Sequence, residues 1–236
     1  IDAAKEEGIT LIIALDCGIK AHKQVNYAAE KGIDFIICDH HLPSKILPPA
    51  VAVLDPKRDD CDYPFKELCG CGIGFKLIQA VQKHLNFSQE ALTIYLDLVA
   101  TAIAADIVPM EGENRTLTFL GLQQFQENPR IGLQFFLKTL KKTIKVTDLV
   151  FVIAPRINAA GRMDQGLSAV ELLMSDNLEL ALPKARSIDF FNTERRSTDE
   201  RITVEALQQI VLNEETTCFS TVVFHHHAFI DCSDSS

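Results

Sequence analysis

Two segments near the start of the chain share one design, in which a short apolar run ends on an aspartate. Residues 11–15 are followed by Asp16, and residues 33–38 are followed by Asp39. Short apolar runs bounded by glycine, proline or polar residues are typical of buried β-strands. The intervening residues 21–31 have helical composition and precede a glycine, a common residue just after a helix. The pattern predicts a strand–helix–strand unit with parallel strands and a right-handed crossover.

The second run is followed by two histidines as well as an acid, in the order Asp39, His40 and His41. Ligands of open parallel sheets bind beyond the carboxyl ends of the strands, so we expect Asp16 and these three residues at one sheet edge. Carboxylates and imidazoles suit Mn²⁺, Mg²⁺ or Zn²⁺. For an isolated Asp-His-His, a turn cap with two surface histidines would be the preferred interpretation. Asp16 occupies the same position after the preceding strand as Asp39 does after its own, and this correspondence favours a metal site.

Composition limits the kind of surface that the chain can offer. The chain has 236 residues, of which 47% are hydrophobic, enough for one large domain or two small ones. A formal net charge of −9 excludes a broad basic surface, so any nucleic-acid contact must be local, made through a metal or made elsewhere in the protein. The seven cysteines lack zinc-site spacing, which indicates reduced thiols in a cytoplasmic protein. We expect neither a membrane span nor a signal peptide.

Both ends of the sequence suggest a piece of a longer protein. The chain begins without methionine, within what reads as the last turns of a helix. After an apolar run at residues 220–224, which we expect to be a strand opening a second domain, the pattern is lost. We therefore expect the chain to be a fragment.

Further acids follow predicted elements in the middle of the chain. Residues 51–54 predict a third short strand, and Asp55 after it precedes a proline and is expected to begin a turn. An apolar helix over residues 89–105 ends on Asp106. A carboxylate leaving a buried helix is costly unless it is paired or binds a metal. We therefore interpret Asp106 as a ligand, with a turn residue before Pro109 as the alternative.

A glycine-rich segment opens another predicted helix. Residues 69–76 carry three glycines and begin a helix that runs to about Leu85. Glycines at a helix start permit close packing and also expose backbone amides to an anion. The segment lacks the Gly-Lys-Ser/Thr ending of a phosphate loop, so both interpretations stay open.

The second half of the chain reads as helical. Helices are predicted over residues 113–126, 131–140, 149–154, 168–174 and 178–212, the last with a mixed-charge face that is expected to be solvated. Between the third and fourth, Arg156, Asn158 and Arg162 lie among small residues. Arginine binds phosphate oxygens in a two-pronged geometry, which favours phosphate contacts. The alternative pairs the two arginines with acids of the same domain.

Together these residues resemble the DHH phosphoesterase superfamily and, within it, the RecJ family of single-strand-specific 5′-to-3′ DNA exonucleases. The resemblance covers about residues 8–224. Asp16-Cys17-Gly18, Asp39-His40-His41 and the Asp106 segment look like the second, third and fourth acidic motifs of the superfamily. Residues 72–76 and 156–162 carry the narrower likeness to the RecJ family. The first motif, an Asp-x-Asp pair, is not in this chain, and the residues after Phe224 do not look like the family's C-terminal phosphate-binding domain.

The resemblance implies an α/β fold, with a parallel sheet and flanking helices (the DHH domain), then a helical region and a long connecting helix. Its expected division is a DHH domain with a helical extension at residues 1–176, the connecting helix at 177–213 and the start of a truncated DHHA1-like domain at 214–236. The implied substrate is single-stranded DNA in repair and recombination, in the cytoplasm and away from membranes, with a single-strand-binding protein and a helicase as further partners.

The implied reaction is phosphodiester hydrolysis with two divalent ions, Mn²⁺ or Mg²⁺. By resemblance Asp16 bridges both ions, and His40 and Asp106 hold one of them. His41 either joins these ligands or orients the phosphate, so all four are the expected catalytic residues. The expected contacts with the DNA phosphates come from the residues Arg156, Asn158 and Arg162. Because the Asp-x-Asp pair is missing, we expect the 236 residues alone to be nearly inactive.

Two alternatives remain at this point. A different DHH enzyme, such as a pyrophosphatase or an oligonucleotide or cyclic-dinucleotide phosphodiesterase, would share the metal ligands. A non-catalytic DHH-like replication scaffold would be expected to have lost them. Against the scaffold, the chain keeps the full set of Asp16, His40, His41 and Asp106.

Overall fold

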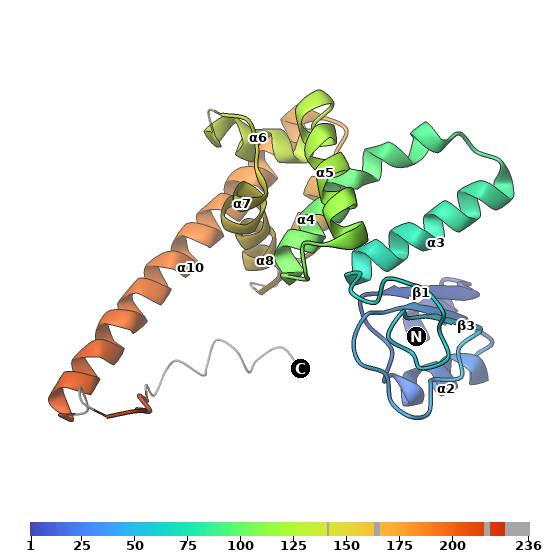
Figure 1. Cartoon of the computed structure of the whole chain (residues 1–236), viewed down its shortest axis with the longest axis horizontal. Coiled ribbons are helices and arrows are strands. Elements are labelled where there is room, and N and C mark those ends of the chain that lie inside the picture. The colour runs from blue at the N-terminus through green and yellow to red at the C-terminus, as the bar shows by residue number, and fades with distance from the viewer. Residues whose placement is uncertain (141, 163–165, 215–217, 225–236) are drawn as a thin grey trace.

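The computed structural model of the chain describes residues 1–140, 142–162, 166–214 and 218–224. A small parallel sheet lies at one end of the molecule, a helical body follows, and one long helix extends away from that body (Figure 1). The predicted fold class is confirmed: an α/β unit with a parallel sheet precedes a helical region that ends in a long helix.

The sheet has three parallel strands in the order in which they occur in the chain. They are β1 (Leu11–Leu15), β2 (Asp34–Cys38) and β3 (Ala52–Leu54). Leu15 pairs with Cys38 and Cys38 pairs with Leu54, so all three strands end at one level. The acid that follows each strand therefore starts from the same edge of the sheet.

Helices pack against this sheet and fix its position. After the short α1 (Asp2–Glu6), α2 (His22–Glu30) forms the crossover between β1 and β2 and buries Val25 and Ala28. The next helix, α3 (Gly70–Leu85), packs on β1 and β2, and in Figure 1 α2 and α3 lie on opposite sides of the sheet. The two helices thus cover part of each face, while alternate residues of β1 stay exposed.

The helix α4 (Leu96–Asp106) connects the sheet to the helical body. Val99 and Ile103 pack with Cys38 and the start of α3, whereas Ala100 and Ala104 join the core of the helical body. Apolar residues on both sides of one helix produce this double packing. Sequence reasoning predicted one helix over residues 89–105; the structure instead places a 3-10 helix, η1 (Gln89–Tyr95), before α4.

The helical body is built around α4 from the elements that follow it. These are α5 (Gly112–Glu127), α6 (Ile131–Leu140), α7 (Val146–Asp148), the π-helical turn η2 (Leu149–Ile153), α8 (Ala154–Arg162) and α9 (Gly166–Met174). The predicted helix at 149–154 is longer in the structure and runs through Pro155 to Arg162. Pro155 lies inside this continuous helical run, directly after the π-helical turn η2, and local widening of this kind is one way in which a helix accommodates a proline.

The long helix α10 (Leu178–Leu212) packs on the body only through its first half. The side chain of Asn177 caps its start by accepting hydrogen bonds from the N–H groups of Glu179 and Leu180. The buried residues described in α10 form one stripe and end at Asn192: Ala181, Ala185, Ile188 and Asn192. The rest of α10 extends away from the other helices (Figure 1).

The predicted strand at residues 220–224 is wrong, because the structure describes these residues as irregular chain. A strand needs a neighbouring strand to pair with its backbone N–H and C=O groups. Here the backbone of Phe224 instead bonds to a side chain. Gln209 donates from Nε2 to the carbonyl of Phe224 at 3.0 Å, and its Oε1 accepts from the N–H of Phe224 at 3.2 Å. Most of the expected C-terminal domain, residues 215–217 and 225–236, lies outside the described residues.

None of the helices described has both the length and the apolar character to cross a membrane.

Candidate active site

Asp16 occupies an unusual backbone conformation directly after β1. Its φ angle is +66°, in the left-handed region that non-glycine residues rarely adopt, and its N–H donates to the carbonyl of Cys38 at 2.8 Å. Gly70, the first residue of α3, packs directly against it, since a Cβ at Gly70 would lie 2.1 Å from Asp16 Oδ1. The start of α3 and the end of β2 together fix where this carboxylate lies.

Asp39 is almost fully buried, with 1% of its surface exposed, and its carboxylate organises the loops at the sheet edge. Its Oδ2 accepts from the N–H of Ile19 at 2.9 Å, and its Oδ1 accepts from the N–H groups of His40 and His41 at 2.8 and 3.2 Å. Burial alone would raise the pKa of Asp39, but these bonds and one from the His41 ring outweigh it and lower the pKa. Asp39 thus caps the turn, as the alternative interpretation of the sequence expected, and it also belongs to a larger hydrogen-bond network.

His40 lies between two carboxylates that come from different elements. Its Nε2 is 3.2 Å from Asp16 Oδ1, which follows β1, and 3.3 Å from Asp106 Oδ2, at the end of α4. The ring is buried, yet neither nitrogen has a hydrogen-bond partner in acceptable geometry among the described residues. Two carboxylate oxygens directed at one imidazole nitrogen without hydrogen-bond alignment fit a shared cation.

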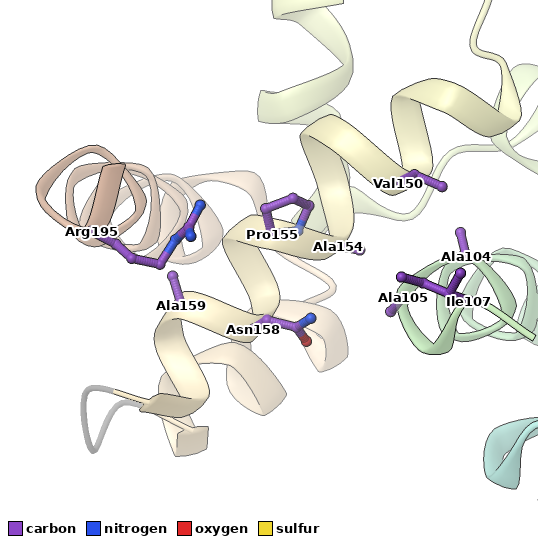
Figure 2. Close-up of a pocket in the computed structure, with 9 residues that line it drawn as sticks. All are labelled: Ala104, Ala105, Ile107, Val150, Ala154, Pro155, Asn158, Ala159 and Arg195. Carbon is purple, nitrogen blue, oxygen red and sulfur yellow. The ribbon is translucent and has the colours of Figure 1, made fainter. Parts of the chain in front are cut away.

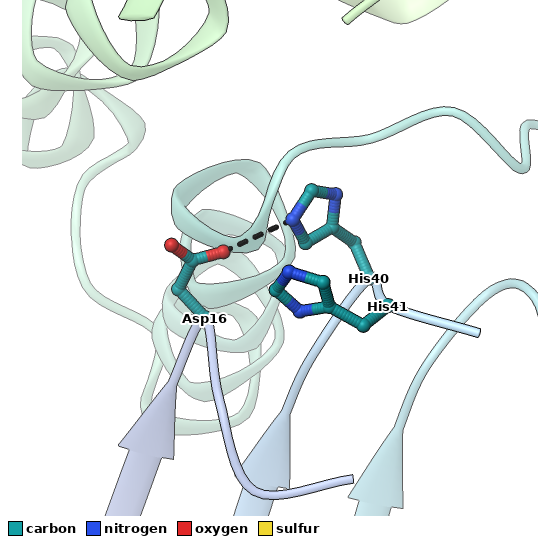
Figure 3. Close-up of side chains that lie close together, drawn as sticks. All are labelled: Asp16, His40 and His41. Carbon is teal, nitrogen blue, oxygen red and sulfur yellow. Dashed lines mark ion pairs between the residues drawn. The ribbon is translucent and has the colours of Figure 1, made fainter. Parts of the chain in front are cut away.

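His41 presents its ring beside that of His40, with the two ring centroids 4.5 Å apart. Its Nδ1 is 2.7 Å from Asp39 Oδ1, and just over half of the His41 side chain is exposed. A carboxylate that accepts from Nδ1–H leaves Nε2 as the free, more basic nitrogen, an arrangement common in metal-binding histidines. Asp16, His40 and His41 each offer a ligand atom, and these atoms all lie within 4.8 Å of one another (Figure 3).

Asp106 is the last residue of α4, and the backbone reverses directly after it. Ile107 has a φ angle of +54°, a strained conformation for a β-branched residue, and its side chain is 82% exposed. The charges at this edge interact: burial raises the pKa of Asp16, His40 opposes that rise and Asp106 adds to it. A cation bound here would favour the charged form of the Asp16 carboxylate.

The three residues predicted to contact phosphate lie on one helix, α8, but in different surroundings. Arg156 donates from Nε to Asp189 Oδ1 at 2.7 Å and from Nη1 to the carbonyl of Val152 at 2.8 Å. These contacts match the alternative in which an arginine pairs with an acid of the same domain. The backbone of Arg162 belongs to α8, while its side chain lies outside the description. Asn158 lines a pocket.

That pocket has a volume of about 230 Å³ and lies between the end of α4, α8 and α10 (Figure 2). Its walls are mostly small or apolar residues, and its two polar side chains are Asn158 and Arg195. Arg195 comes from α10, within the mixed-charge segment that sequence reasoning assigned to solvent. No local sequence signal distinguishes Arg195 from its charged neighbours; only the packing of α10 beside α8 brings it here.

Comparison with known proteins gives this arrangement a family. A family model described as "DHH family, N-terminal domain" matches residues 2–103. The chain belongs to the DHH family. It is related to proteins named single-stranded-DNA-specific exonuclease RecJ: that of Bacillus subtilis is 40% identical over 87% of this chain, and that of Salmonella typhimurium is 35% identical over 95%.

A solved structure agrees with this relationship. The crystal structure of RecJ in complex with Mn²⁺ from Thermus thermophilus matches with a TM-score of 0.78 and 30% identity over 88% of this chain. The chain spans only part of each relative: 26% of the Bacillus protein, 42% of the Salmonella protein and 32% of the Thermus chain. The parts of these relatives that lie outside the match have no counterpart in the 236 residues compared.

The glycine-rich segment of this DHH protein serves close packing in the structure. Besides Gly70 against Asp16, Gly74 lies against Leu15, where an added Cβ would be 3.1 Å from a Leu15 methyl carbon. Cys69 caps the helix, its Sγ accepting from the N–H of Gly72 at 3.3 Å. These contacts support the packing interpretation of the segment, because they draw α3 against the end of β1.

Asp55 confirms the predicted turn after β3, since its Oδ1 accepts from the N–H of Lys57 at 2.8 Å. The residue is only 2% exposed, and burial raises its pKa. It lies beside Asp39, because the strands that precede the two acids are paired at Cys38 and Leu54.

Proposed function

We propose that this DHH protein takes part in metal-dependent hydrolysis of phosphodiester bonds at the 5′ end of single-stranded DNA, as in the RecJ relatives. The observation that carries the proposal is the approach of Asp16 Oδ1 and Asp106 Oδ2 to one nitrogen of His40, at 3.2 and 3.3 Å. Three residues from three elements meet at the carboxyl edge of the sheet, where open parallel sheets bind ligands.

The residues fit a divalent cation. Mn²⁺ binds sites that combine carboxylates with imidazole, and Mg²⁺ binds carboxylates. Asp16, His40 and Asp106 would hold the ion, with His41 as an additional ligand or a phosphate contact. A bound divalent ion polarises a phosphoryl oxygen and lowers the pKa of a water molecule. The second ion of the proposed pair requires carboxylates beyond those that the described residues bring together.

The remaining residues position the reacting groups. The bond from His41 Nδ1 to Asp39 fixes the ring, so its Nε2 is available to the substrate or the ion. Asp39 also ties this loop to the one after β1 through Ile19. Asn158 on α8 would donate to a phosphate oxygen of the strand, and Arg156 and Arg162 are the other proposed phosphate contacts. Because the chain is acidic overall, with a net charge of −9, these contacts must be local.

The proposal places the protein in the cytoplasm, in DNA repair and recombination, where a single-strand-binding protein and a helicase would supply the strand. It also keeps the expected division of the chain, with a DHH domain and helical extension at residues 1–176, a connecting helix at 177–213 and the start of a further domain at 214–236.

Calorimetry with Mn²⁺ tests the ligand assignment directly. The unmodified chain should bind about one Mn²⁺ ion, in line with one set of converging ligands. His40→Ala should abolish that binding, whereas His84→Ala, which removes an exposed imidazole from α3, should not affect it. Mn²⁺ binding that survives in His40→Ala would contradict the assignment.

Product analysis tests the substrate. A 5′-phosphorylated single strand, the matching duplex and pyrophosphate are each incubated with the chain and Mn²⁺. We expect slow release of mononucleotides from the single strand only, slow because the described residues hold one ion of the proposed pair. Faster hydrolysis of pyrophosphate than of the strand would replace the exonuclease proposal with the pyrophosphatase alternative.

A further inference from the structure

The pocket between α4, α8 and α10 begins where the candidate metal centre ends. Ala105 and Ile107 line it, and Asp106 between them carries the carboxylate that lies 3.3 Å from His40 Nε2. If one phosphate of a DNA strand binds at the metal centre, the pocket is therefore the adjacent site on the side of α4.

Arg195 offers this pocket a hydrogen-bond donor with no partner. Its Nε is shielded from solvent and has no hydrogen-bond partner in the part of the chain that the structure describes. Elsewhere on the guanidinium, Nη1 donates to Asp199 Oδ2 at 2.7 Å, and the side chain as a whole is about one third exposed. A buried N–H of a charged group costs free energy until an acceptor reaches it, so the vacant Nε is a feature that needs an acceptor.

The second polar group of the pocket, Asn158, comes from α8. Asn158 projects from α8 on the side that faces Ala105 and Ile107, while the Arg195 side chain extends from α10 over Ala159 (Figure 2). Between them the wall is made of small residues such as Ala154. Two donors in a pocket lined by small residues fit an anionic group, and the small residues leave space for a polymer backbone to approach closely.

The neighbouring arginine of α8 is engaged elsewhere. Arg156 is held by Asp189 and by the carbonyl of Val152, and its guanidinium stacks 5.5 Å from the ring centre of Phe136. Releasing it would break these contacts. Arg195 needs no such release, because its Nε is already free of protein partners among the described residues.

We propose that this pocket binds a phosphate of the single strand next to the one at the metal centre, with the Arg195 guanidinium as the main donor and the Asn158 amide as the second. Arg195 is then a substrate-binding residue of α10. This inference rests on the proposed function, since it takes the anion to be a DNA phosphate.

The test measures DNA binding without metal, so that it is independent of cleavage. Fluorescence anisotropy of a 12-nucleotide thymidine oligonucleotide in EDTA is recorded over a range of salt concentrations, with the whole 236-residue chain. Arg195→Gln should weaken binding about tenfold, because a charge-assisted hydrogen bond is lost. The slope of log K against log salt should also fall by about 0.7, the contribution of one phosphate contact on a single strand.

Matched variants separate position from charge. Arg196→Gln removes an equal charge from the exposed neighbour on α10, and its affinity should stay within about twofold of the unmodified chain. Arg195→Lys should restore the salt slope but only part of the affinity, since lysine keeps the charge and loses the forked donors of the guanidinium. Asn158→Ala should weaken binding without changing the slope. Circular dichroism confirms that each variant is folded.

The outcomes distinguish this inference from the proposed function. Equal affinities and slopes for Arg195→Gln and Arg196→Gln would overturn the Arg195 assignment, and His40-dependent Mn²⁺ binding and strand cleavage would still stand. Failure of the unmodified chain to bind the oligonucleotide at low salt would overturn both. If Arg195→Gln alone lowers the DNA affinity and the salt slope, the result supports phosphate binding in the pocket even if no cleavage is detected.

Discussion

The carboxylate of Asp39 accepts a hydrogen bond from the backbone N–H of Ile19, and this bond joins the loop after β2 to the loop after β1. The same carboxylate holds the His41 ring through Nδ1. One buried acid thus sets the distance between two loops that carry proposed metal ligands.

Asp39→Asn should lower the free energy of unfolding by about 3 kcal/mol, because an amide replaces a buried, charged acceptor of several hydrogen bonds. Urea unfolding at neutral pH measures the change. Asp34→Asn is the control, since it removes an exposed carboxylate from the start of the same strand. Equal effects of the two substitutions would show that the network around Asp39 adds no stability.

The stabilisation from Asp39 should also depend on pH. Its pKa is lowered in the folded chain, so the ionised form is favoured by folding. The stability difference between the unmodified chain and Asp39→Asn should be complete above about pH 4, the pKa of an unfolded aspartate. It should disappear as the pH falls through the lower folded pKa. A difference that grew on acidification would contradict this sign.

Gly70→Ala should damage the metal centre from outside it. The new Cβ would lie 2.1 Å from Asp16 Oδ1 and 2.6 Å from Asp16 Cα, so the residue must shift. We expect Mn²⁺ binding to weaken about tenfold to hundredfold, as when a supporting residue of a metal site is lost. Gly72→Ala on the same turn meets nothing closer than 3.4 Å and should bind Mn²⁺ normally. Calorimetry compares the two variants.

The edge strand β1 should make the 236-residue chain prone to association. Leu11, Ile13 and Leu15 point to one face and are 44%, 47% and 51% exposed. An edge strand with exposed apolar residues is a template for pairing with another chain. Ile13→Lys should reduce light scattering at equal protein concentration. The control Val204→Lys, on α10, removes a valine that is 54% exposed and lies outside the sheet, and it should have a smaller effect.

Asp199→Asn should act on DNA binding in the opposite direction to Arg195→Gln. Asp199 competes for the Arg195 guanidinium through Nη1 and adds a negative charge near the pocket. Removing that charge should tighten oligonucleotide binding by about twofold to fivefold, the range of an exposed ion pair. Anisotropy in EDTA measures it, with Glu194→Gln as the charge-matched control. Weaker binding by Asp199→Asn would indicate that this pair positions Arg195 productively.

The sheet and its acids were predictable because their signals are local in the sequence. Apolar runs that end on Asp16 and Asp39 specify strands and place both acids at one edge. Asp106 was found because a carboxylate at the end of an apolar helix needs a partner, and the structure places it beside His40. The ligand roles of these residues stay predictions.

Other features depend on packing that no short segment encodes. Pro155 ends a helix in most sequence patterns, yet here it falls in the first turn of α8 and the helix continues. Arg195 resembles its charged neighbours, and only the stripe of buried residues ending at Asn192 turns it towards α8. The run at 220–224 has strand composition but no partner strand in the described residues.

Because the buried stripe of α10 ends at Asn192, a tilt of its outer half would turn about that residue. Leu212 lies about 30 Å beyond that pivot, at 1.5 Å of rise per residue, whereas Arg195 lies only about 5 Å beyond it. A tilt of about 10° at the pivot would therefore move Leu212 by about 5 Å and Arg195 by less than about 1 Å. Movement of the outer half of α10 would therefore leave the guanidinium at the pocket nearly in place.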